Sequence, residues 1–324
     1  MTGRITRRVA LRIFGAGLAL PLGAFGLRAL RDAPRSVRWE GEVLGGLASM
    51  TLWHPNPAIA RRAIARMQIE VARLENVFSL YRPNSEIVRL NRDGMLGSPS
   101  TDLVHVLALG QRFGGASMGA FDPTIQPLWR LHAQGAKAVQ DPARLERVRA
   151  LVDYRALSAN RRAIRLGNPD MEISLNGIAQ GYITDRITEI LGNDGFETAM
   201  IDLGETRALG SAPDGAPFSV GLIDPAVASG IDRDVPLANA ALSVSGGYGM
   251  RFDTTGRHHI LDPRSGESAQ TLTRVAVISP KAVWADALST AIYVAGSGAA
   301  KGLLAAYPGS RAILSRSDGT SVEV

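Results

Sequence analysis

The chain has 324 residues, of which 45% are hydrophobic and 20% charged, so it is long and apolar enough to fold around a substantial core. Its formal net charge is +6, but residues 1–30 hold five arginines and no acidic residue, which leaves about +1 for the remainder. A nearly neutral chain without a lysine-rich run argues against nucleic-acid binding. The absence of cysteine excludes disulfides, thiolate metal sites and cysteine nucleophiles.

The N-terminal segment has the composition of an export signal. The pair Arg7-Arg8 precedes an uncharged run, Ile13 to Leu27, that is rich in glycine and alanine. This pattern resembles a twin-arginine leader. The alternative is a permanent membrane anchor, but a helix needs roughly 20 apolar residues to cross a bilayer. We therefore predict a leader over residues 1–31 and a periplasmic protein, which stays tethered to the membrane if the leader is retained.

The first half of the remaining chain is predicted to be largely helical. Residues 37–54 have an extended pattern, and residues 64–78 place apolar side chains at steps of three and four, as an amphipathic helix does. A turn containing Pro83 follows this helix. Further helices are predicted over 103–113, with Ser100 or Thr101 as N-cap and Gly114-Gly115 as the end, and over 142–151.

The second half is predicted to contain mainly short strands. Residues 163–166 and 171–175 are expected to form a hairpin around Gly167-Asn168-Pro169, and residues 178–191 a helix. Further strands are predicted over 198–203, 218–223, 241–244, 250–253 and 273–278, and a last helix over 286–295. No repeat or linker interrupts residues 37–324, so we predict one large α+β domain of antiparallel sheets with helices packed on their outer faces.

Two oxygen-bearing residues open the last predicted helix. Asp286 and Thr290 are four apart, which places them one turn apart on the same face. A carboxylate and a hydroxyl suit a hard cation such as Mg²⁺. The alternative, which is favoured for this motif in isolation, is an N-cap aspartate with a packed threonine.

A second motif is the run His258-His259-Ile260-Leu261-Asp262-Pro263. The two histidines are expected to end a strand, where neighbouring side chains point to opposite faces, so at most one of them reaches a given site. That histidine is suited to take or give a proton near neutral pH. The alternative is an edge-strand histidine bonded to a backbone carbonyl.

Two glycine-containing segments complete the candidate site. The run from Ser174 to Tyr182 puts two glycines at a strand-to-helix junction, where backbone N–H groups can approach an anion. The run from Ser117 to Trp129 contains a rigid turn that could hold a planar ring. Each of these segments also has a purely structural interpretation, as a tight turn and as a packed loop.

In combination these segments resemble the ApbE family of FAD:protein FMN transferases. The resemblance extends from about Leu44 to Gly296 and rests on the pieces FSLYRPNSE, GAFDPTIQPLW, NGIAQGY, SVSGGY, HHILDPRSG and ADALSTAIYVAG. It implies an enzyme that moves the FMN part of FAD onto a threonine or serine of a target protein, depends on Mg²⁺ and releases AMP.

The resemblance also assigns roles to residues. It implies Asp286, Thr290 and the backbone carbonyl of Ala179 as ligands of Mg²⁺, all of them oxygen donors, in agreement with the chemistry of the first motif. It implies His259 as the residue near the transferred phosphate, as a base or as a charge stabiliser. The implied contacts with FAD are Tyr81, Ala120, Phe121, Asp122, Ser174, Gln180 and Ile260.

The chain departs from the family pattern near the expected phosphate site. Many relatives have Asp at the position of Ser174, and Lys or Glu at that of Gln180. An early Met-Gly-Thr motif is here Leu44-Gly45-Gly46, and a common Gly-Gly-Asp is Gly204-Glu205-Thr206. These changes affect expected FAD contacts and leave the expected metal ligands in place.

Three other functions compete with this hypothesis. The same site would serve a periplasmic protein that binds FAD without transferring FMN, or a metal-dependent pyrophosphatase that hydrolyses FAD. A structural or interaction module would leave the oxygen ligands unexplained. The family's acceptors are membrane-bound redox subunits, and the sequence identifies neither the acceptor nor the oligomeric state.

Overall fold

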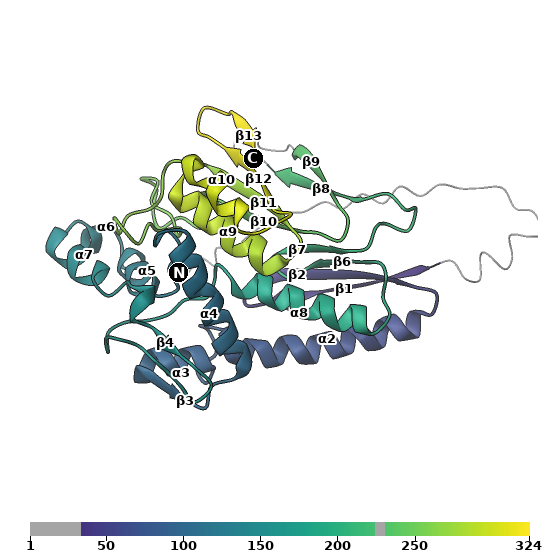
Figure 1. The fold of residues 1–324 in the computed structure, drawn as a ribbon, viewed down its shortest axis with the longest axis horizontal. Helices are drawn as coiled ribbons and strands as arrows, with labels where there is room; N and C mark the ends of the chain where they lie inside the picture. The colour runs from purple at the N-terminus through teal and green to yellow at the C-terminus, as the bar shows by residue number, and fades with distance from the viewer. Residues whose placement is uncertain (1–33, 224–230) are drawn as a thin grey trace, which may run out of the picture.

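An eight-stranded antiparallel sheet forms the centre of the molecule in the computed structural model, which describes residues 34–223 and 231–324 (Figure 1). The predicted leader, residues 1–31, lies outside the described residues. Within the described ranges, no helix combines the length and apolar character needed to span a membrane. In spatial order the strands are β1 (Arg35–Val43), β2 (Gly46–His54), β6 (Ala199–Asp202), β7 (Thr206–Leu209), β10 (Ala241–Ser245), β11 (Arg274–Ser279), β12 (Arg311–Ser315) and β13 (Ser321–Glu323).

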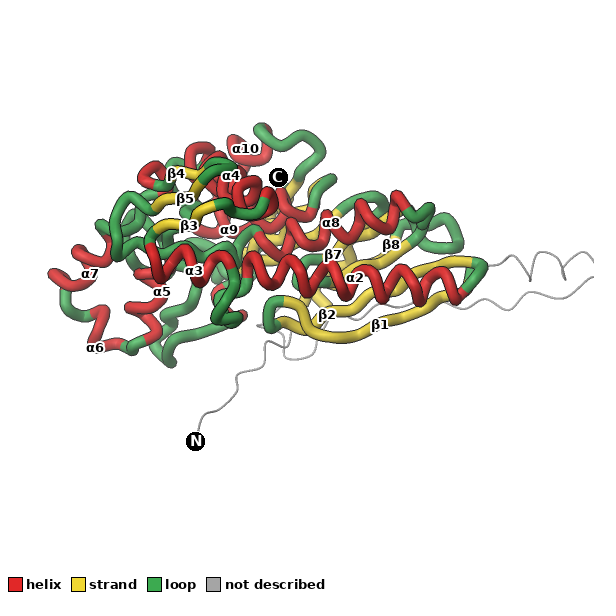
Figure 2. The backbone as a smooth tube through the Cα atoms, turned by 90° about the horizontal axis from the view of Figure 1, so that it is seen from below, coloured by secondary structure: helices red, strands yellow, loops and turns green. Residues whose placement is uncertain are grey.

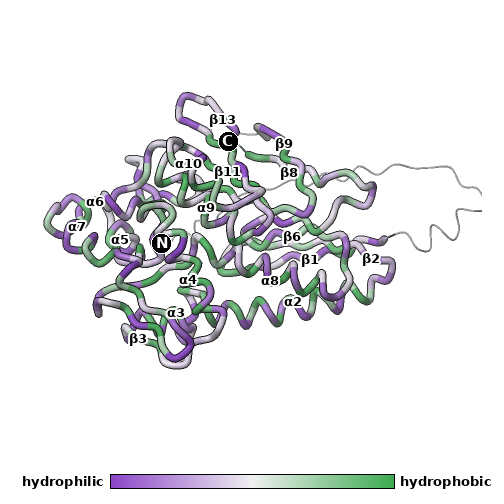
Figure 3. The backbone as a smooth tube through the Cα atoms, viewed as in Figure 1, coloured by the Kyte–Doolittle hydropathy of each residue, from purple (hydrophilic) through white to green (hydrophobic). Residues whose placement is uncertain are grey.

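Three helices cover one face of this sheet. The helix α2 (Pro57–Phe78) runs along β1 and β2, α8 (Ala179–Asn193) lies beside it over β6 and β7, and α9 (Ala282–Ala295) covers β10 and β11 (Figure 2). The amphipathic pattern predicted for α2 is confirmed, because its apolar stripe is buried while its other face stays hydrophilic (Figure 3). The side chain of Asn56 caps this helix by accepting a hydrogen bond from Ala58 N–H at 2.9 Å.

A hairpin covers the opposite face of the sheet. It consists of β8 (Phe218–Ile223) and β9 (Ile231–Leu237), and its buried residues pack against Met200, Ala208 and Ile278 of the central strands. Strand β11 is therefore buried at every position, since α9 lies on one side and the hairpin's core on the other. The predicted α+β class is confirmed, with helices on one face and a β-hairpin on the other.

The remaining elements gather at one end of the molecule (Figure 1). A small sheet has the strand order β3-β5-β4. The helix α4, which follows β3 in the chain, has the side chain of Ser100 as its N-cap, one of the two predicted candidates. These elements are α3 (Glu86–Asp93), β3 (Met95–Gly97), α4 (Thr101–Ala116), α5 (Gln126–Ala133), α6 (Ala136–Val139), α7 (Pro142–Arg149), η1 (Tyr154–Ala156), β4 (Ser158–Ala159) and β5 (Ala163–Arg165). Two further short elements are η2 (Gly247–Gly249) and α10 (Ser297–Ala305).

The hairpin predicted from residues 163–166 and 171–175 is wrong. Strand β5 pairs with β3 and β4 instead. The amide side chain of Asn91 takes the place of a strand neighbour for the second segment: its Nδ2 donates to Ile173 O at 2.8 Å and its Oδ1 accepts from Ile173 N–H at 2.7 Å. Periodicity along the chain cannot reveal a side chain that satisfies a backbone from 82 residues away.

Two local boundaries also differ from prediction. Residues 250–253 form no strand, because the Asp253 carboxylate accepts N–H groups of Thr255 and Arg257 and folds the segment into a turn. The helix α4 continues through Gly114 to Ala116. A side chain at Gly114 would lie 2.7 Å from the ring of Tyr154, so this glycine allows close packing and does not end the helix.

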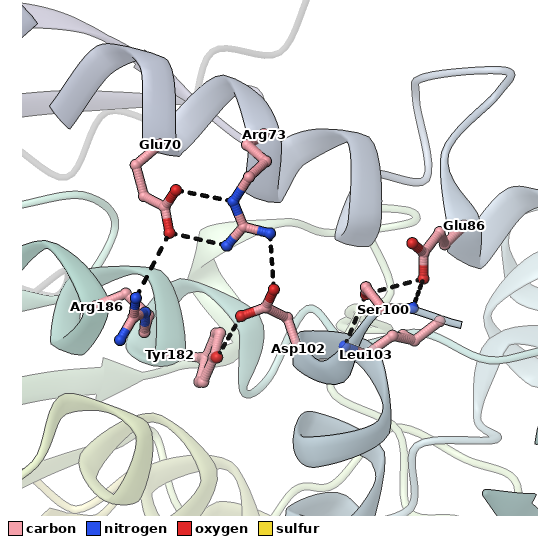
Figure 4. Close-up of polar contacts among 8 residues, drawn as sticks. All are labelled: Glu70, Arg73, Glu86, Ser100, Asp102, Leu103, Tyr182 and Arg186. Atoms are coloured by element: carbon pink, nitrogen blue, oxygen red, sulfur yellow. Dashed lines mark hydrogen bonds and ion pairs between the residues drawn. The ribbon is translucent and has the colours of Figure 1, made fainter. Parts of the chain in front are cut away.

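A charged network ties α8 to α2 and α4 (Figure 4). Arg73 on α2 donates to Glu70 at 2.8 Å and to Asp102 on α4 at 2.7 Å. The hydroxyl of Tyr182 on α8 donates to the other oxygen of Asp102 at 2.6 Å, and Arg186 lies 3.9 Å from Glu70. Burial alone would raise the pKa of Asp102, but the hydrogen bonds from Arg73 and Tyr182 lower it. The network therefore holds an ionised carboxylate between three helices.

Candidate active site

The N-terminal turns of α8 and α9 cap each other. The N–H of Gly181 on α8 donates to Oδ2 of Asp286 on α9 at 3.0 Å. In return, Asp185 on α8 accepts the N–H groups of Ala282 and Val283 on α9, at 2.8 and 3.0 Å. A side chain at Gly181 would lie 2.5 Å from the Ala282 carbonyl oxygen, so only glycine permits this approach. The two helix starts are therefore held together by backbone contact and by one carboxylate from each side.

Asp286 is not the N-cap of its helix. Helix α9 begins at Ala282, one turn earlier than predicted, and this excludes the structural alternative raised for the aspartate. The Asp286 side chain is buried, with 3% of the residue exposed. Thr290 follows one turn later on the same face, and its Oγ1 lies 3.3 Å from Oγ of Ser245. The carboxylate and hydroxyl expected to bind a cation are thus adjacent on one helix.

The loop before α8 reaches the same place. A side chain at Gly177 would lie 3.2 Å from Oγ1 of Thr290 and 3.3 Å from the ring of Phe121. Ala179 is the first residue of α8, is buried, and lies two residues before the Gly181 amide that Asp286 accepts. The structure thus brings the three predicted metal ligands, Asp286, Thr290 and Ala179, to the junction of α8 and α9.

The three predicted ligands are a carboxylate, a hydroxyl and a backbone carbonyl, and such oxygen donors suit a hard cation. Among the residues that the structure describes, no group of three or more His, Cys, Asp or Glu side chains could hold a metal ion. A cation at this junction would therefore depend on one carboxylate supplemented by hydroxyl and carbonyl oxygens, as Mg²⁺ sites often do.

Three of the four segments that depart from the family pattern lie together, and Ser174 is the exception. A side chain at Gly204 would meet the Gln180 amide at 2.2 Å, and one at Gly46 would lie 3.6 Å from the same amide nitrogen. Leu44, with a φ of 50°, donates its N–H to Glu75 at 2.8 Å. A side chain at Gly45 would lie 3.8 Å from the Tyr81 ring. These three departures therefore form one patch around Gln180, close to Tyr81.

A cavity of about 610 Å³ lies next to this junction. Tyr81, which is 75% exposed, lines it together with Asn176, the residue before Gly177. Burial raises the pKa of the lining residue Glu172. The guanidinium of Arg130, whose Nε lies 2.7 Å from Oε2 of Glu172, partly opposes this rise. The residues lining the cavity are Leu80, Tyr81, Val88, Asn91, Arg92, Gln126, Trp129, Arg130, Glu172 and Asn176.

The predicted Ala120-Phe121-Asp122 turn is rigid and packs against the loop before α8. Oδ1 of Asp122 accepts the N–H and hydroxyl of Thr124 at 2.8 and 2.6 Å, and Oδ2 accepts Tyr154 N–H at 2.9 Å. Burial raises the pKa of Asp122 against the effect of these hydrogen bonds. Ser174 N–H donates to the Pro123 carbonyl at 2.8 Å, which joins the turn to the segment leading into Gly177.

His258 is a structural histidine. It is buried, and its Nδ1 accepts Ile260 N–H at 3.3 Å, so the proton resides on Nε2, which donates to the Ala269 carbonyl at 2.7 Å. Burial lowers the pKa of His258 and keeps the ring neutral. Its Nε2 also lies 3.5 Å from the hydroxyl of Tyr293, which accepts Gly247 N–H at 3.1 Å. His258 thus holds its segment against α9 at Tyr293, which lies less than one helical turn after Thr290.

His259 has a different environment. Its ring lies 6.5 Å from that of His258 at an interplanar angle of 71°. The prediction that the two histidines end a strand is wrong, because neither lies in one of the strands. Nδ1 of His259 lies 3.0 Å from the Met250 carbonyl, which can only accept, so Nδ1 carries the proton. Nε2 is then the basic nitrogen of the ring. Ile260, also predicted, is buried, and its carbonyl accepts Ala269 N–H at 3.1 Å.

Sequence reasoning missed the residues that support the site. Asp185, Ser289 and Tyr293 were not singled out, although each contacts a segment of the candidate site. The spacing of Gly181 and Asp185, four residues apart on one helix, is the signal that could have identified Asp185 as a residue facing α9.

Comparison with known proteins agrees with this geometry. A model of the ApbE family matches residues 44–314. The FAD:protein FMN transferase of Haemophilus influenzae is 26% identical over 301 residues, 87% of each chain, and one from Klebsiella pneumoniae is 30% identical over 284 residues, 84% of this chain and 85% of the relative.

Solved structures share the fold. The flavin transferase ApbE from Vibrio cholerae has a TM-score of 0.76 at 23% identity and covers 90% of this chain and 97% of its own. The apo form of the Pseudomonas stutzeri flavinyl transferase ApbE has a TM-score of 0.76 at 24% identity and covers 90% of this chain and 96% of its own. With a family model spanning most of its length and a relative at 30% identity, this chain belongs to the ApbE family.

Proposed function

We propose that this protein transfers the FMN part of FAD to a threonine or serine hydroxyl of an acceptor protein and releases AMP. The observation that carries this proposal is the junction where Asp286 and Thr290 of α9 meet the start of α8, beside a cavity of about 610 Å³. Relatives named FAD:protein FMN transferase, at 24–30% identity over most of the chain, support the activity.

The junction would hold Mg²⁺ through the Asp286 carboxylate, the Thr290 hydroxyl and the Ala179 carbonyl. When bound, the ion would reduce the negative charge that builds up on the pyrophosphate of FAD. The protein's own contribution is rigidity: Asp286 is fixed by Gly181 N–H, and Thr290 lies against Ser245 and the Gly177 loop. Oxygen donors that are held in place before the substrate arrives lose little freedom on binding.

The transfer step exchanges the phosphoanhydride bond of FAD for a phosphoester bond to the acceptor. The acceptor's hydroxyl oxygen bonds to the phosphorus adjacent to riboflavin, and the bond from that phosphorus to the bridging oxygen breaks, so AMP leaves with the electron pair of that bond. The hydroxyl proton must be removed as the new bond forms. We assign this task to Nε2 of His259, because the Met250 carbonyl holds the ring in the tautomer that has Nε2 basic.

The cavity offers a place for the substrate's rings. Tyr81 and Trp129 provide aromatic surfaces, and Gln126 and Asn176 provide amide groups for hydrogen bonds. The Ala120-Phe121-Asp122 turn, Ser174, Gln180 and Ile260 remain predicted contacts with FAD. Of these, Gln180 is the one next to the turn at Gly46, where the chain departs from its relatives.

The setting of the reaction follows from the N-terminal segment. The twin-arginine pattern over residues 1–31 supports export to the periplasm, with the chain tethered there if the leader stays attached. We propose a membrane-bound redox subunit as the acceptor, because such proteins expose flavin-carrying domains in that compartment.

Two alternatives use the same site with a different acceptor. A metal-dependent pyrophosphatase would use water and release free FMN and AMP, and a binding protein would keep FAD intact. Both need the α8–α9 junction or its cavity, so the fate of the FMN group is what separates them from a transferase.

The deciding experiment combines the mature protein with FAD, Mg²⁺ and a candidate acceptor domain, followed by intact-mass measurement of the acceptor. We expect a mass gain equal to one FMN moiety that is lost in Asp286→Ala. Free FMN and AMP without a modified acceptor would instead identify a hydrolase, and intact FAD after prolonged incubation would identify a binding protein.

A further inference from the structure

Asp185 lies outside the predicted ligand set but holds the helix that carries two of the ligands. We propose that Asp185 is a positioning residue that sets the start of α9, and through it the position of Asp286 and Thr290 relative to Ala179. The proposal rests on the metal site of the proposed function and adds to it the residue that builds the site.

The first step is that neither helix caps itself. The N-cap residue of α8 is Ile178 and that of α9 is Lys281, and neither side chain makes a capping hydrogen bond. The first N–H groups of a helix have no partner within it, so an outside acceptor decides where the helix begins. Asp185 is that acceptor for α9, since its two oxygens take the N–H groups of Ala282 and Val283 at 2.8 and 3.0 Å.

The second step is that the capped turn directly precedes the ligands. Ala282 lies one turn before Asp286, and Asp286 one turn before Thr290, on a continuous helix. A shift or fraying at Ala282 therefore moves the Asp286 carboxylate. Gly181 and Asp185 are likewise one turn apart on α8. The same face of α8 therefore makes hydrogen bonds to α9 at Asp286 and at Ala282.

The third step concerns charge. Asp185 is half-buried, and burial raises its pKa, while the N–H groups of Val283 and Ala282 and the nearby cations Arg207 and Lys281 oppose the rise. Burial lowers the pKa of Arg207, and Asp185 counteracts this shift in turn. Nε and Nη1 of Arg207 are buried and make no hydrogen bond in the described part of the chain. Removing the charge of Asp185 would thus leave a poorly solvated guanidinium beside the helix start, as well as two uncapped N–H groups.

The test measures metal binding without the reaction. Mn²⁺ is titrated into the full mature chain in the absence of FAD and its free concentration is followed by electron paramagnetic resonance. We expect Asp185→Ala to weaken Mn²⁺ binding by about 10- to 100-fold, as the loss of groups that orient metal ligands does. Asp185→Asn keeps one acceptor oxygen and should have an intermediate effect. In the transfer assay, raising Mg²⁺ should restore much of the rate of Asp185→Asn.

Asp141 provides a matched control. Its side chain caps α7 by accepting Arg144 N–H at 3.1 Å, on a helix that carries no predicted site residue. Asp141→Ala removes a helix cap worth about 1 kcal/mol and should leave Mn²⁺ binding unchanged.

Each outcome has a distinct meaning. If Asp185→Ala loses stability but binds Mn²⁺ as tightly as the wild-type chain does, the cap is only structural and the proposal is wrong. If the wild-type chain itself binds no Mn²⁺, the metal site of the proposed function fails, and the positioning role fails with it. Should Asp185→Ala not fold, as judged by circular dichroism, Asp185→Asn carries the same comparison.

Discussion

The N–H of Gly181 lies 3.0 Å from Oδ2 of Asp286, so a single carboxylate both caps helix α8 and faces the site where a cation is expected. In the proposed site this contact would serve two ends. The start of a helix has a partial positive charge and would attract the anionic phosphates of a dinucleotide, while the carboxylate and hydroxyl of α9 would attract the cation that accompanies them.

The first prediction concerns Gly181→Ala. The added Cβ would lie 2.5 Å from the Ala282 carbonyl oxygen and 2.7 Å from the Val283 Cα, both backbone atoms, so the two helices must separate. We expect a loss of about 1–3 kcal/mol in the free energy of unfolding, measured by chemical denaturation, together with weaker Mn²⁺ binding.

Gly302→Ala is the matched control. Gly302 also lies within a helix, α10, but a Cβ there meets no atom within 4 Å. This substitution should be neutral or stabilise the protein by up to about 1 kcal/mol. Equal destabilisation by both variants would show that the close approach at Gly181 is unimportant.

The second prediction concerns the Thr290 hydroxyl. Thr290→Val keeps the shape of the side chain but removes the oxygen that lies 3.3 Å from Ser245. If this oxygen is a metal ligand, Mn²⁺ binding should weaken at least tenfold, or about 1.4 kcal/mol. Thr290→Ser retains the oxygen and should bind nearly as the wild type does. Similar metal binding in the two variants would remove Thr290 from the ligand set.

Local pattern was sufficient to predict the helices α2 and α4. The apolar period of α2 and the Ser100 cap of α4 depend on neighbours a few residues away, and the structure confirms both. The segments that family resemblance brought together, around Asp286, Ala179 and Phe121, also meet in space.

Two of the errors share one cause, which is contact between distant segments. The backbone of Ile173 is satisfied by Asn91, and the start of α9 is fixed by Asp185 on another helix, 97 residues away in sequence. A capping signal is sought next to the helix that it caps, so α9 was predicted to begin at Asp286. Only the fold shows that the acceptor comes from α8.

The third prediction concerns His259. His259→Gln removes the basic Nε2 that the Met250 carbonyl orients, so the transfer rate should fall by about 10²- to 10⁴-fold. FAD binding, followed by flavin fluorescence, and Mn²⁺ binding should both persist. His54→Gln, at the end of β2, serves as the control and should retain activity. A rate within twofold of the wild type for His259→Gln would exclude the histidine as the base.

The fourth prediction concerns the network of Figure 4. Tyr182→Phe removes the hydroxyl that donates to Oδ1 of Asp102 at 2.6 Å. The hydrogen bond from Arg73 to Oδ2 of Asp102 remains. We expect a loss of about 1–3 kcal/mol in the free energy of unfolding. Tyr154→Phe is the control, because its hydroxyl makes no hydrogen bond within the ranges that the structure covers. An equal effect of both substitutions would mean that the hydrogen bond to Asp102 contributes nothing.

The fifth prediction concerns the pH dependence of stability. Burial lowers the pKa of both His258 and His132, and His132 Nε2 lies 2.8 Å from the Gly266 carbonyl. Both rings are neutral in the folded protein, whereas in the unfolded chain they take up protons near pH 6.5. Their contribution to stability is therefore complete above about pH 6.5 and is lost as the pH falls toward the lowered values, at up to about 1.4 kcal/mol per pH unit for each histidine.

Denaturation at pH 7.5 and 5.5 measures this loss, and the double variant His132→Gln, His258→Gln isolates it. Asp122 and Asp185, whose pKa values are raised by burial, act with the opposite sign, since their titration lowers stability as the pH rises. The double variant keeps these carboxylates and removes only the histidines, so its stability should change less between the two pH values than that of the wild type. An unchanged difference would show that the two rings accept protons in the folded state as readily as in the unfolded chain.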